Sequence, residues 1–239
     1  MNPSRAARSA TLRNLRGGLV VSCQALPGEP LHGPRFMARM ALAAVRGGAV
    51  GIRANGPADI RAIRCTVNVP IIGLWKGGSR GLSITPTFRH AAAVARAGAD
   101  LVALDATQDP RPDGISLSET IARLHGEFGV GVVADVGDFR TGLAAEAAGA
   151  DAVATTLSGY LTSRPPPPGP DLQLVRRLAA HLHTPVIAEG RFATPDQARR
   201  ALASGALAVV VGAAITRPQT ITSRFVAAIG PRTRRGGAR

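Results

Sequence analysis

The chain has 239 residues, 45% of them apolar, which is enough to bury one large core or two small ones. The formal net charge of +14 fits nucleic acid, an anionic metabolite or a general arginine bias, but no zinc-ligand pattern or RNA-binding signature accompanies it. No apolar run reaches the roughly eighteen residues of a membrane span, and no long apolar stretch follows the arginine-rich start, so we expect neither a membrane anchor nor a secretory signal.

The two ends of the chain differ from its middle. We predict a basic N-terminal segment over residues 1–17, a catalytic domain over 18–229 and a basic, solvated tail over 230–239. Such ends give a weak, salt-sensitive affinity for polyanions, and we expect no specific nucleic-acid partner. Cys23 and Cys65 form no close-spaced metal or redox motif, which favours reduced thiols and a cytoplasmic location.

Short runs rich in Val, Ile, Leu and Ala recur along the chain, apolar on both faces like parallel strands covered on both sides. They span residues 18–22, 49–53, 70–74, 101–105, 131–135, 152–155, 185–189 and 208–211. Eight strands is the count of a closed barrel, and the first run lacks the glycine-rich dinucleotide fingerprint of an open doubly wound sheet. We therefore predict an α/β fold, a single-domain (β/α)8 TIM barrel.

Alanine-rich stretches between the strands carry helix signals. We predict helix starts, with proline in the first turn where it occurs, at Gly56-Pro57, Thr85-Pro86-Thr87, Ser116-Leu117-Ser118-Glu119 and Thr194-Pro195-Asp196. The helices end at glycines that supply a left-handed residue before the next strand: Gly48, Gly98, Gly149 and Gly205. Two strand-to-helix connections are long, 76–84 and 157–170, and the four prolines at 165–168 predict a stiff loop wall.

Polar residues close nearly every apolar run, at the end where barrel strands converge on one mouth. They are Gln24, Arg53, Lys76, Asp105, Asp135, Thr155 with Thr156, Glu189 and Gly212. Any one of them could stand there because the chain is leaving the core. The presence of polar residues at nearly all of the strand ends favours a functional site.

Lys76 is the only lysine among 29 basic residues, and Glu189 closes the seventh strand. A lysine in a dry pocket can release and regain its proton, which arginine cannot do, so the pair could move a proton beside a carbonyl group. Two alternatives stay open: an arginine-rich chain can retain one lysine by chance, and Glu189 could form a barrel-interior salt bridge. Asp135 could likewise help to cap the following helix together with Asp138.

The last two strands suggest an anion site. Glycine follows each of them, in Gly190-Arg191 and in Gly212-Ala213, and Arg217 lies close behind. Exposed backbone N–H groups after strands seven and eight of this fold commonly bind phosphate, and an arginine adds a bidentate fork. The alternative is a tight turn with a solvated arginine.

Several motifs resemble one family, N-acylglucosamine-6-phosphate 2-epimerase, also called N-acetylmannosamine-6-phosphate epimerase. The resemblance covers about residues 18–229. Its motifs are Ser22-Cys23-Gln24, Met40-Ala41-Leu42-Ala43-Ala44, Gly51-Ile52-Arg53, residues 70–74 with Lys76, Ile84-Thr85-Pro86-Thr87, Ala134-Asp135, residues 155–160, residues 187–191 and residues 211–217.

The resemblance implies a (β/α)8 barrel that inverts C2 of N-acetylmannosamine 6-phosphate, in amino-sugar and sialic acid catabolism, without metal or cofactor. It implies Lys76 and Glu189 as the catalytic residues and a phosphorylated amino sugar as the small-molecule partner, with a homodimer expected. The substrate-binding residues that it implies are Gln24, Arg53, Asp135, Thr155, Ser158, Gly190, Arg191, Gly212, Ala213 and Arg217.

The sequence departs from the family pattern directly after Lys76, where a shorter Gly77-Gly78-Ser79-Arg80-Gly81 replaces a longer loop that commonly begins with an acidic residue. We expect this change to affect the lid over the site and, through it, which acyl group the substrate carries. Two other functions remain possible from the residues alone. One is a class I aldolase or lyase with Lys76 as Schiff-base nucleophile, and the other is a basic nucleic-acid-binding protein.

Overall fold

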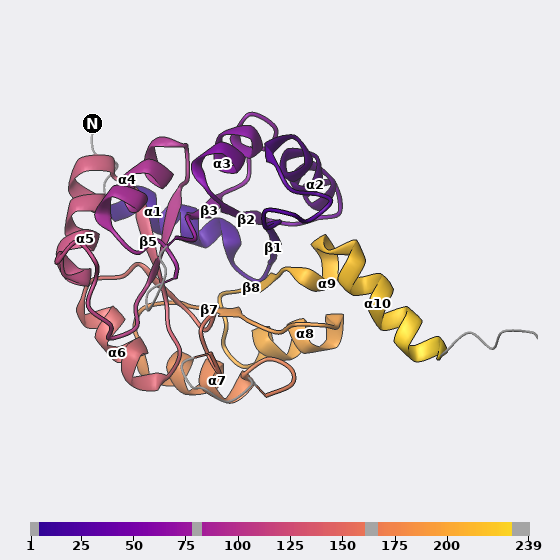
Figure 1. The fold of residues 1–239 in the computed structure, drawn as a ribbon. Helices are drawn as coiled ribbons and strands as arrows, with labels where there is room; N and C mark the ends of the chain where they lie inside the picture. Colours follow the sequence, from indigo (N-terminus) through magenta and orange to yellow (C-terminus); the bar gives the residue numbers. More distant parts are fainter. Residues whose placement is uncertain (1–4, 78–82, 161–166, 231–239) are drawn as a thin grey trace, which may run out of the picture.

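Eight parallel strands pair in sequence order and close into a barrel in this computed structural model (Figure 1). The structure describes residues 5–77, 83–160 and 167–230. The strands are β1 (Leu19–Cys23), β2 (Gly51–Asn55), β3 (Ile71–Leu74), β4 (Leu101–Asp105), β5 (Gly131–Asp135), β6 (Ala152–Ala154), β7 (Val186–Glu189) and β8 (Ala208–Val211). β8 pairs in parallel with β1, which closes the barrel. The predicted (β/α)8 fold is confirmed.

Helices between consecutive strands surround the barrel, and further helices precede β1 and follow β8 (Figure 1). They are α1 (Arg5–Leu15), α2 (Pro34–Arg46), α3 (Pro57–Arg64), α4 (Phe88–Arg96), α5 (Leu117–Arg123) with a π-helical turn η1 (Leu124–Phe128), α6 (Phe139–Ala147), α7 (Leu172–His181), α8 (Pro195–Ala203), α9 (Ala213–Thr216) and α10 (Pro218–Ile229). No helix within the described ranges is long and apolar enough to cross a bilayer.

The predicted helix signals are confirmed at all but one position. Helices α3, α5 and α8 begin where predicted, with Ser116 and Thr194 as N-caps of the last two. The four terminating glycines have left-handed φ angles of 94° to 101°. The exception is Pro86, which precedes the helix instead of entering its first turn. Thr87 is the N-cap of α4 because its side chain accepts a hydrogen bond from the His90 amide.

Residues alternate between two apolar shells along every strand except β2, which contributes to the outer shell alone. One shell fills the barrel interior and contains Val20, Ile72, Ala103, Val133, Ala154, Ile187 and Val210. The other, which includes Ile52, Leu104 and Val209, packs against the surrounding helices. The interior shell ends at the carboxyl ends of the strands, where the next inward positions are polar.

The two terminal helices differ in how they contact the barrel. Helix α1 inserts Leu12 and Leu15 into the interior shell, and Arg8 forms an ion pair with Asp151 at 3.1 Å between Nε and Oδ1. Helix α10 extends away from the barrel (Figure 1), and none of its residues is buried. The predicted tail beyond Gly230 lies outside the described residues.

Gly73 on β3 tests how tightly the outer shell is packed. A Cβ atom there would lie 2.7 Å from both Ala99 Cβ and Val94 Cγ1, so Gly73→Ala should lower the free energy of unfolding by about 1–3 kcal/mol. Gly126→Ala is the matched control, because its Cβ would meet no atom within 4 Å. Denaturant unfolding of both variants measures the difference, and equal stabilities would contradict the packing described.

Candidate active site

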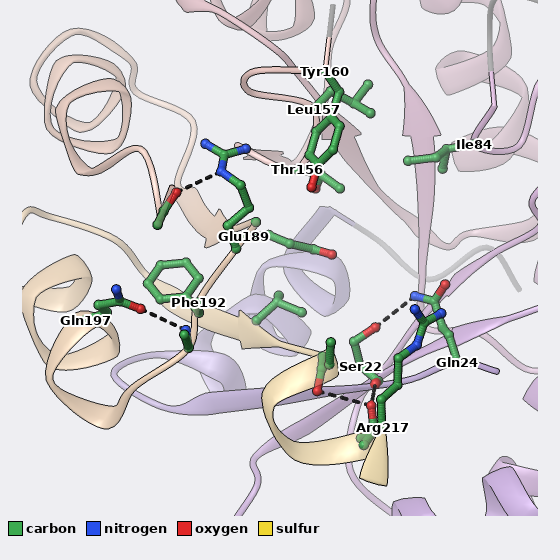
Figure 2. A pocket seen from close by; sticks show the side chains of 18 of the residues that line it. Ser22, Gln24, Ile84, Thr156, Leu157, Tyr160, Glu189, Phe192, Gln197 and Arg217 are labelled. Carbon is green, nitrogen blue, oxygen red and sulfur yellow. Dashed lines mark hydrogen bonds between the residues drawn. The ribbon is translucent and has the colours of Figure 1, made fainter. Parts of the chain in front are cut away.

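A cavity of about 720 Å³ opens at the carboxyl ends of the strands (Figure 2). Most of its polar lining comes from inward strand-end positions and from the loops that follow β6, β7 and β8. The lining includes Ser22, Gln24, Lys76, Thr156, Glu189, Gly190, Arg191, Gly212, Ala213 and Arg217. Glu189 and Lys76 therefore face one space, although they come from strands far apart in the sequence.

Arg53 lies beneath Glu189 and carries the charge around which this region is arranged. Its side chain is 1% exposed and donates two hydrogen bonds to the Asp135 carboxylate, Nη1 to Oδ1 at 3.1 Å and Nη2 to Oδ2 at 2.6 Å. Glu189 Oε2 lies 2.9 Å from Arg53 Nη1, close enough for an ion pair, but without hydrogen-bond alignment. Asp138, not Asp135, caps the following helix α6, which leaves Asp135 free to bind Arg53.

Charge and burial act in opposite directions on these groups. Burial disfavours the Arg53 cation, but the attraction of Asp135 and Glu189 outweighs it and raises the Arg53 pKa. Burial raises the pKa of Glu189 to about 7, Arg53 opposes the rise and Asp135 adds to it. Glu189 can thus exchange a proton near neutral pH, as a general acid or base requires.

Lys76 lies on a short hairpin after β3, made of residues 75–77 and 83–85, which we call the lysine hairpin. Lys76 pairs with Ile84 as an antiparallel bridge, and its amide donates to Asn55 Oδ1 at 2.8 Å. The residue as a whole is exposed, but its ammonium group lies among the cavity groups. Burial first, and then the charge of Arg53, lower its pKa, whereas Glu189 raises it.

Lys76 and Glu189 share the cavity without forming an ion pair, since the cation in contact with Glu189 is Arg53. The sequence predicted that the Glu189 carboxylate flanks the Lys76 ammonium. The two groups thus interact over a longer distance than a direct contact. The departure from the family pattern at residues 78–81 lies outside the described part of the chain.

Three buried polar atoms at this site lack a hydrogen-bond partner within the described residues: Gln24 Oε1, Arg53 Nε and Glu189 Oε2. Gln24 is held by its other amide atom, because Nε2 donates to Ser22 Oγ at 2.8 Å (Figure 2). Buried polar atoms without a hydrogen bond are rare in native proteins, and their concentration here is typical of a site that binds a polar molecule.

The predicted anion-binding residues lie on the β7–β8 side of the cavity. Gly190 has φ of 112°, a backbone conformation that residues with a side chain rarely adopt, so the turn favours glycine. Gly212 precedes α9, and Arg217 reaches Glu29 at 3.3 Å, Nη2 to Oε1, while still lining the cavity.

Five predicted substrate-binding residues have contacts that hold the protein itself. Arg53 and Asp135 lie under the cavity floor, and the Thr155 hydroxyl donates to the Glu189 carbonyl at 2.9 Å. Ser158 Oγ donates to Asp171 at 2.7 Å. Arg191 lines the cavity, but its guanidinium binds the Gly169 carbonyl at 2.7 Å and the Ser158 carbonyl, which ties the β6 loop to β7.

Thr156, not Thr155, projects into the cavity from β6. The two-residue period of a strand identifies it, because Ala152 and Ala154 belong to the interior shell and position 156 continues that face. Its hydroxyl donates to Asp135 Oδ1 at 2.5 Å. Among the described residues, no group of three His, Cys, Asp or Glu side chains is placed to hold a metal ion.

The family model described as "Putative N-acetylmannosamine-6-phosphate epimerase" matches residues 37–231. The chain belongs to this epimerase family. A protein of Cutibacterium acnes named "Putative N-acetylmannosamine-6-phosphate 2-epimerase" is 55% identical over 90% of this chain and 94% of its own length. A relative of the same name from Caldanaerobacter subterraneus is 50% identical over 92% of this chain and 94% of its own length.

A solved structure supports the same membership in this epimerase family. The N-acetylmannosamine-6-phosphate 2-epimerase from Clostridium perfringens superimposes with a TM-score of 0.87 and 41% sequence identity. The match covers 92% of this chain and 96% of that one, so the similarity in fold extends over nearly the full length of both.

Because Lys76 is the only lysine, its pKa can be measured after reductive ¹³C-methylation by NMR. We expect titration below the ordinary lysine value of about 10.4. In Glu189→Gln the pKa should fall further, because the variant removes the carboxylate that favours the ammonium. Methylation also labels the N-terminal amine. The Lys76→Arg variant identifies that signal, because it contains no lysine. An unshifted pKa in the native chain would contradict the buried ammonium.

Proposed function

We propose that the chain interconverts N-acetylmannosamine 6-phosphate and N-acetylglucosamine 6-phosphate by moving the proton at C2. The observation that carries this proposal is the pair of ionisable groups facing one cavity with opposite pKa shifts, Lys76 lowered and Glu189 raised to about 7. Two groups brought toward neutral pH from opposite sides can each give and take a proton there. Membership in the epimerase family supports this reaction and this substrate.

The proposed reaction begins with opening of the sugar ring, which exposes the C1 aldehyde and acidifies the neighbouring C2 proton. Lys76, in its amine form, removes this proton, and the enolate that forms is stabilised by polar groups at the barrel mouth. A proton then returns to the opposite face of C2, and the ring closes. Glu189 is the second acid–base group, and its negative charge stabilises the protonated form of Lys76.

The substrate's remote phosphate is proposed to bind between Gly190, Gly212, Ala213 and Arg217, which face the cavity from β7 and β8. Holding the phosphate there orients the reacting carbon toward Lys76. Gln24 offers its unpaired carbonyl oxygen to the acyl amide or a hydroxyl. Arg53 and Asp135 are proposed to act on the sugar through Glu189, whose position and charge they set.

Lys76→Arg tests the proton carrier. Arginine keeps its proton, so we expect C2 deuterium incorporation in heavy water and epimerisation to fall together, by about 10² to 10⁴-fold. NMR of N-acetylmannosamine 6-phosphate in heavy water measures both rates. Arg176→Lys, an exposed exchange on α7, is the matched control with unchanged activity. Near-normal turnover in Lys76→Arg would exclude the lysine role, and a borohydride-trapped adduct on Lys76 would favour a Schiff-base lyase.

A homodimer is part of the proposal, and α10 supports it. Ile221, Phe225, Val226 and Ile229 form one apolar stripe, and the last three are 67%, 59% and 83% exposed. Exposed apolar stripes of this kind mark contacts between proteins, and a second copy of the chain supplies a surface that carries the same stripe. The cytoplasmic location stays a prediction, which the two free cysteines support.

The stripe on α10 makes the dimer testable. In Phe225→Asp/Ile229→Asp a charge would be buried at the contact, so the mass from light scattering should fall from twice 24.5 kDa to 24.5 kDa. Leu143→Asp places one such charge at an exposed leucine on α6, away from α10, and should leave the mass unchanged. A native chain that elutes as a monomer would overturn the proposal.

A further inference from the structure

The hairpin that carries Lys76 has two arms that are bonded to each other. The Thr85 amide donates to the Trp75 carbonyl at 2.9 Å, and the Trp75 amide donates to Thr85 Oγ1 at 3.1 Å. The Gly77 amide donates to the Ser83 carbonyl at 3.2 Å. The position of Lys76 therefore depends on what holds the second arm, residues 83–85.

The end of β4 holds two residues of that second arm. The Asp105 amide donates to the Ile84 carbonyl at 2.9 Å, and the Ser83 amide donates to Asp105 Oδ2 at 3.2 Å. Asp105 Oδ1 is occupied by Thr107, whose hydroxyl donates to it at 2.7 Å. Asp105 closes a strand as the sequence indicates, but both of its carboxylate oxygens are used within the protein.

Arg111 holds the third residue of the arm. Its Nη2 donates to the Thr85 carbonyl at 2.6 Å, and its Nη1 donates to the Asp105 carbonyl at 3.2 Å. One guanidinium thus bridges the backbone of the lysine hairpin and the backbone at the end of β4. Arg111 is 9% exposed, so the link between these two loops is made by a buried cation.

The backbone at Thr85 explains why the link is needed. Thr85 is a fully buried non-glycine residue with φ of +50°, a conformation that side chains other than glycine's disfavour. A strained residue persists only where its surroundings hold it, and here the amide, hydroxyl and carbonyl of Thr85 are all bonded. Arg111 supplies the bond to the carbonyl.

We infer that Arg111 is a positioning residue for the reaction: by bridging the Thr85 and Asp105 carbonyls, it fixes the hairpin that presents Lys76 to the cavity. The inference rests on the proposed role of Lys76. The other cavity groups reach the substrate from other strands, so loss of Arg111 should impair the proton transfer more than substrate binding.

Arg111→Ala tests this inference through a split between kinetic constants. A displacement of about 1 Å at a reacting group costs up to about 10²-fold, so we expect kcat to fall about 10- to 100-fold and KM to change less than about threefold. Arg111→Lys should lose nearly as much, because one ammonium cannot reproduce the two-carbonyl bridge. Arg111→Lys also keeps a cation at this position, so it can serve as the test if the alanine variant fails to fold.

Arg64→Ala is the matched control for the loss of a structural arginine. Arg64 also donates to two backbone carbonyls, those of Gly98 at 3.1 Å and Val69 at 3.4 Å, but near the amino-terminal ends of β3 and β4. It should lower stability without lowering kcat. If Arg64→Ala and Arg111→Ala lose kcat equally, the role of Arg111 is general stability and the inference is wrong.

Chemical rescue adds a readout that general stability would not move. Arg111 borders a cavity of about 310 Å³ and has a buried Nε without a partner in the described residues, so free guanidinium can reach the space left by Arg111→Ala. Guanidinium chloride well below denaturing concentrations should restore kcat in Arg111→Ala, while equal sodium chloride should not. Absence of rescue in a folded variant with native hairpin protection would overturn the inference.

Amide hydrogen exchange separates this inference from the proposed function. Protection of the Gly77, Ser83 and Thr85 amides should fall in Arg111→Ala and stay native in Arg64→Ala, whatever the reaction is. If exchange changes in this way but the native chain shows no epimerisation, the proposed function fails and the hairpin support stands. If epimerisation is present and neither exchange nor kcat changes in Arg111→Ala, the support fails alone.

Discussion

A guanidinium buried beneath the cavity imposes the charge balance on which the site depends. An ion as buried as Arg53 costs several kcal/mol unless it is paired, and Asp135 pairs with it through two hydrogen bonds. Glu189 is then a second carboxylate beside a cation that is already neutralised. Its own burial therefore dominates and raises its pKa to about 7. The burial of the carboxylate on β7, which the already neutralised arginine on β2 only partly offsets, thus brings the pKa of Glu189 toward neutral pH.

The two proposed proton-handling groups are supported in different ways. Glu189 ends a barrel strand, and its backbone is bonded to the Thr155 hydroxyl through both its amide and its carbonyl. Lys76 lies on a hairpin outside the barrel, and its support comes from Asp105 and Arg111. A strand end is a rigid place for a group whose pKa must be set by fixed neighbours. A hairpin lets a long side chain reach the same cavity from the opposite side.

Much of the fold could be predicted because it follows from local pattern. All eight strands agree with the apolar runs within two residues, since a strand buried on both faces must be apolar throughout. The candidate site was less predictable. The apolar pattern identified both Thr155 and Thr156 as strand-end residues, and the family resemblance assigned Thr155 to substrate binding, but it is Thr156 that lines the cavity. Arg191 was predicted from its glycine neighbour, and only the structure shows its bonds to the β6 loop.

The sequence by itself determined the barrel and the polar residues at its mouth, because strand periodicity and glycine caps act over a few residues. Only the tertiary structure decided which charges meet. Arg53 and Asp135 are 82 positions apart, and their contact depends on how β2 and β5 are staggered around the barrel. The same holds for Arg111, which lies in a loop and has no apolar pattern to mark it. Its role comes from two carbonyl groups that the fold brings within reach of one side chain.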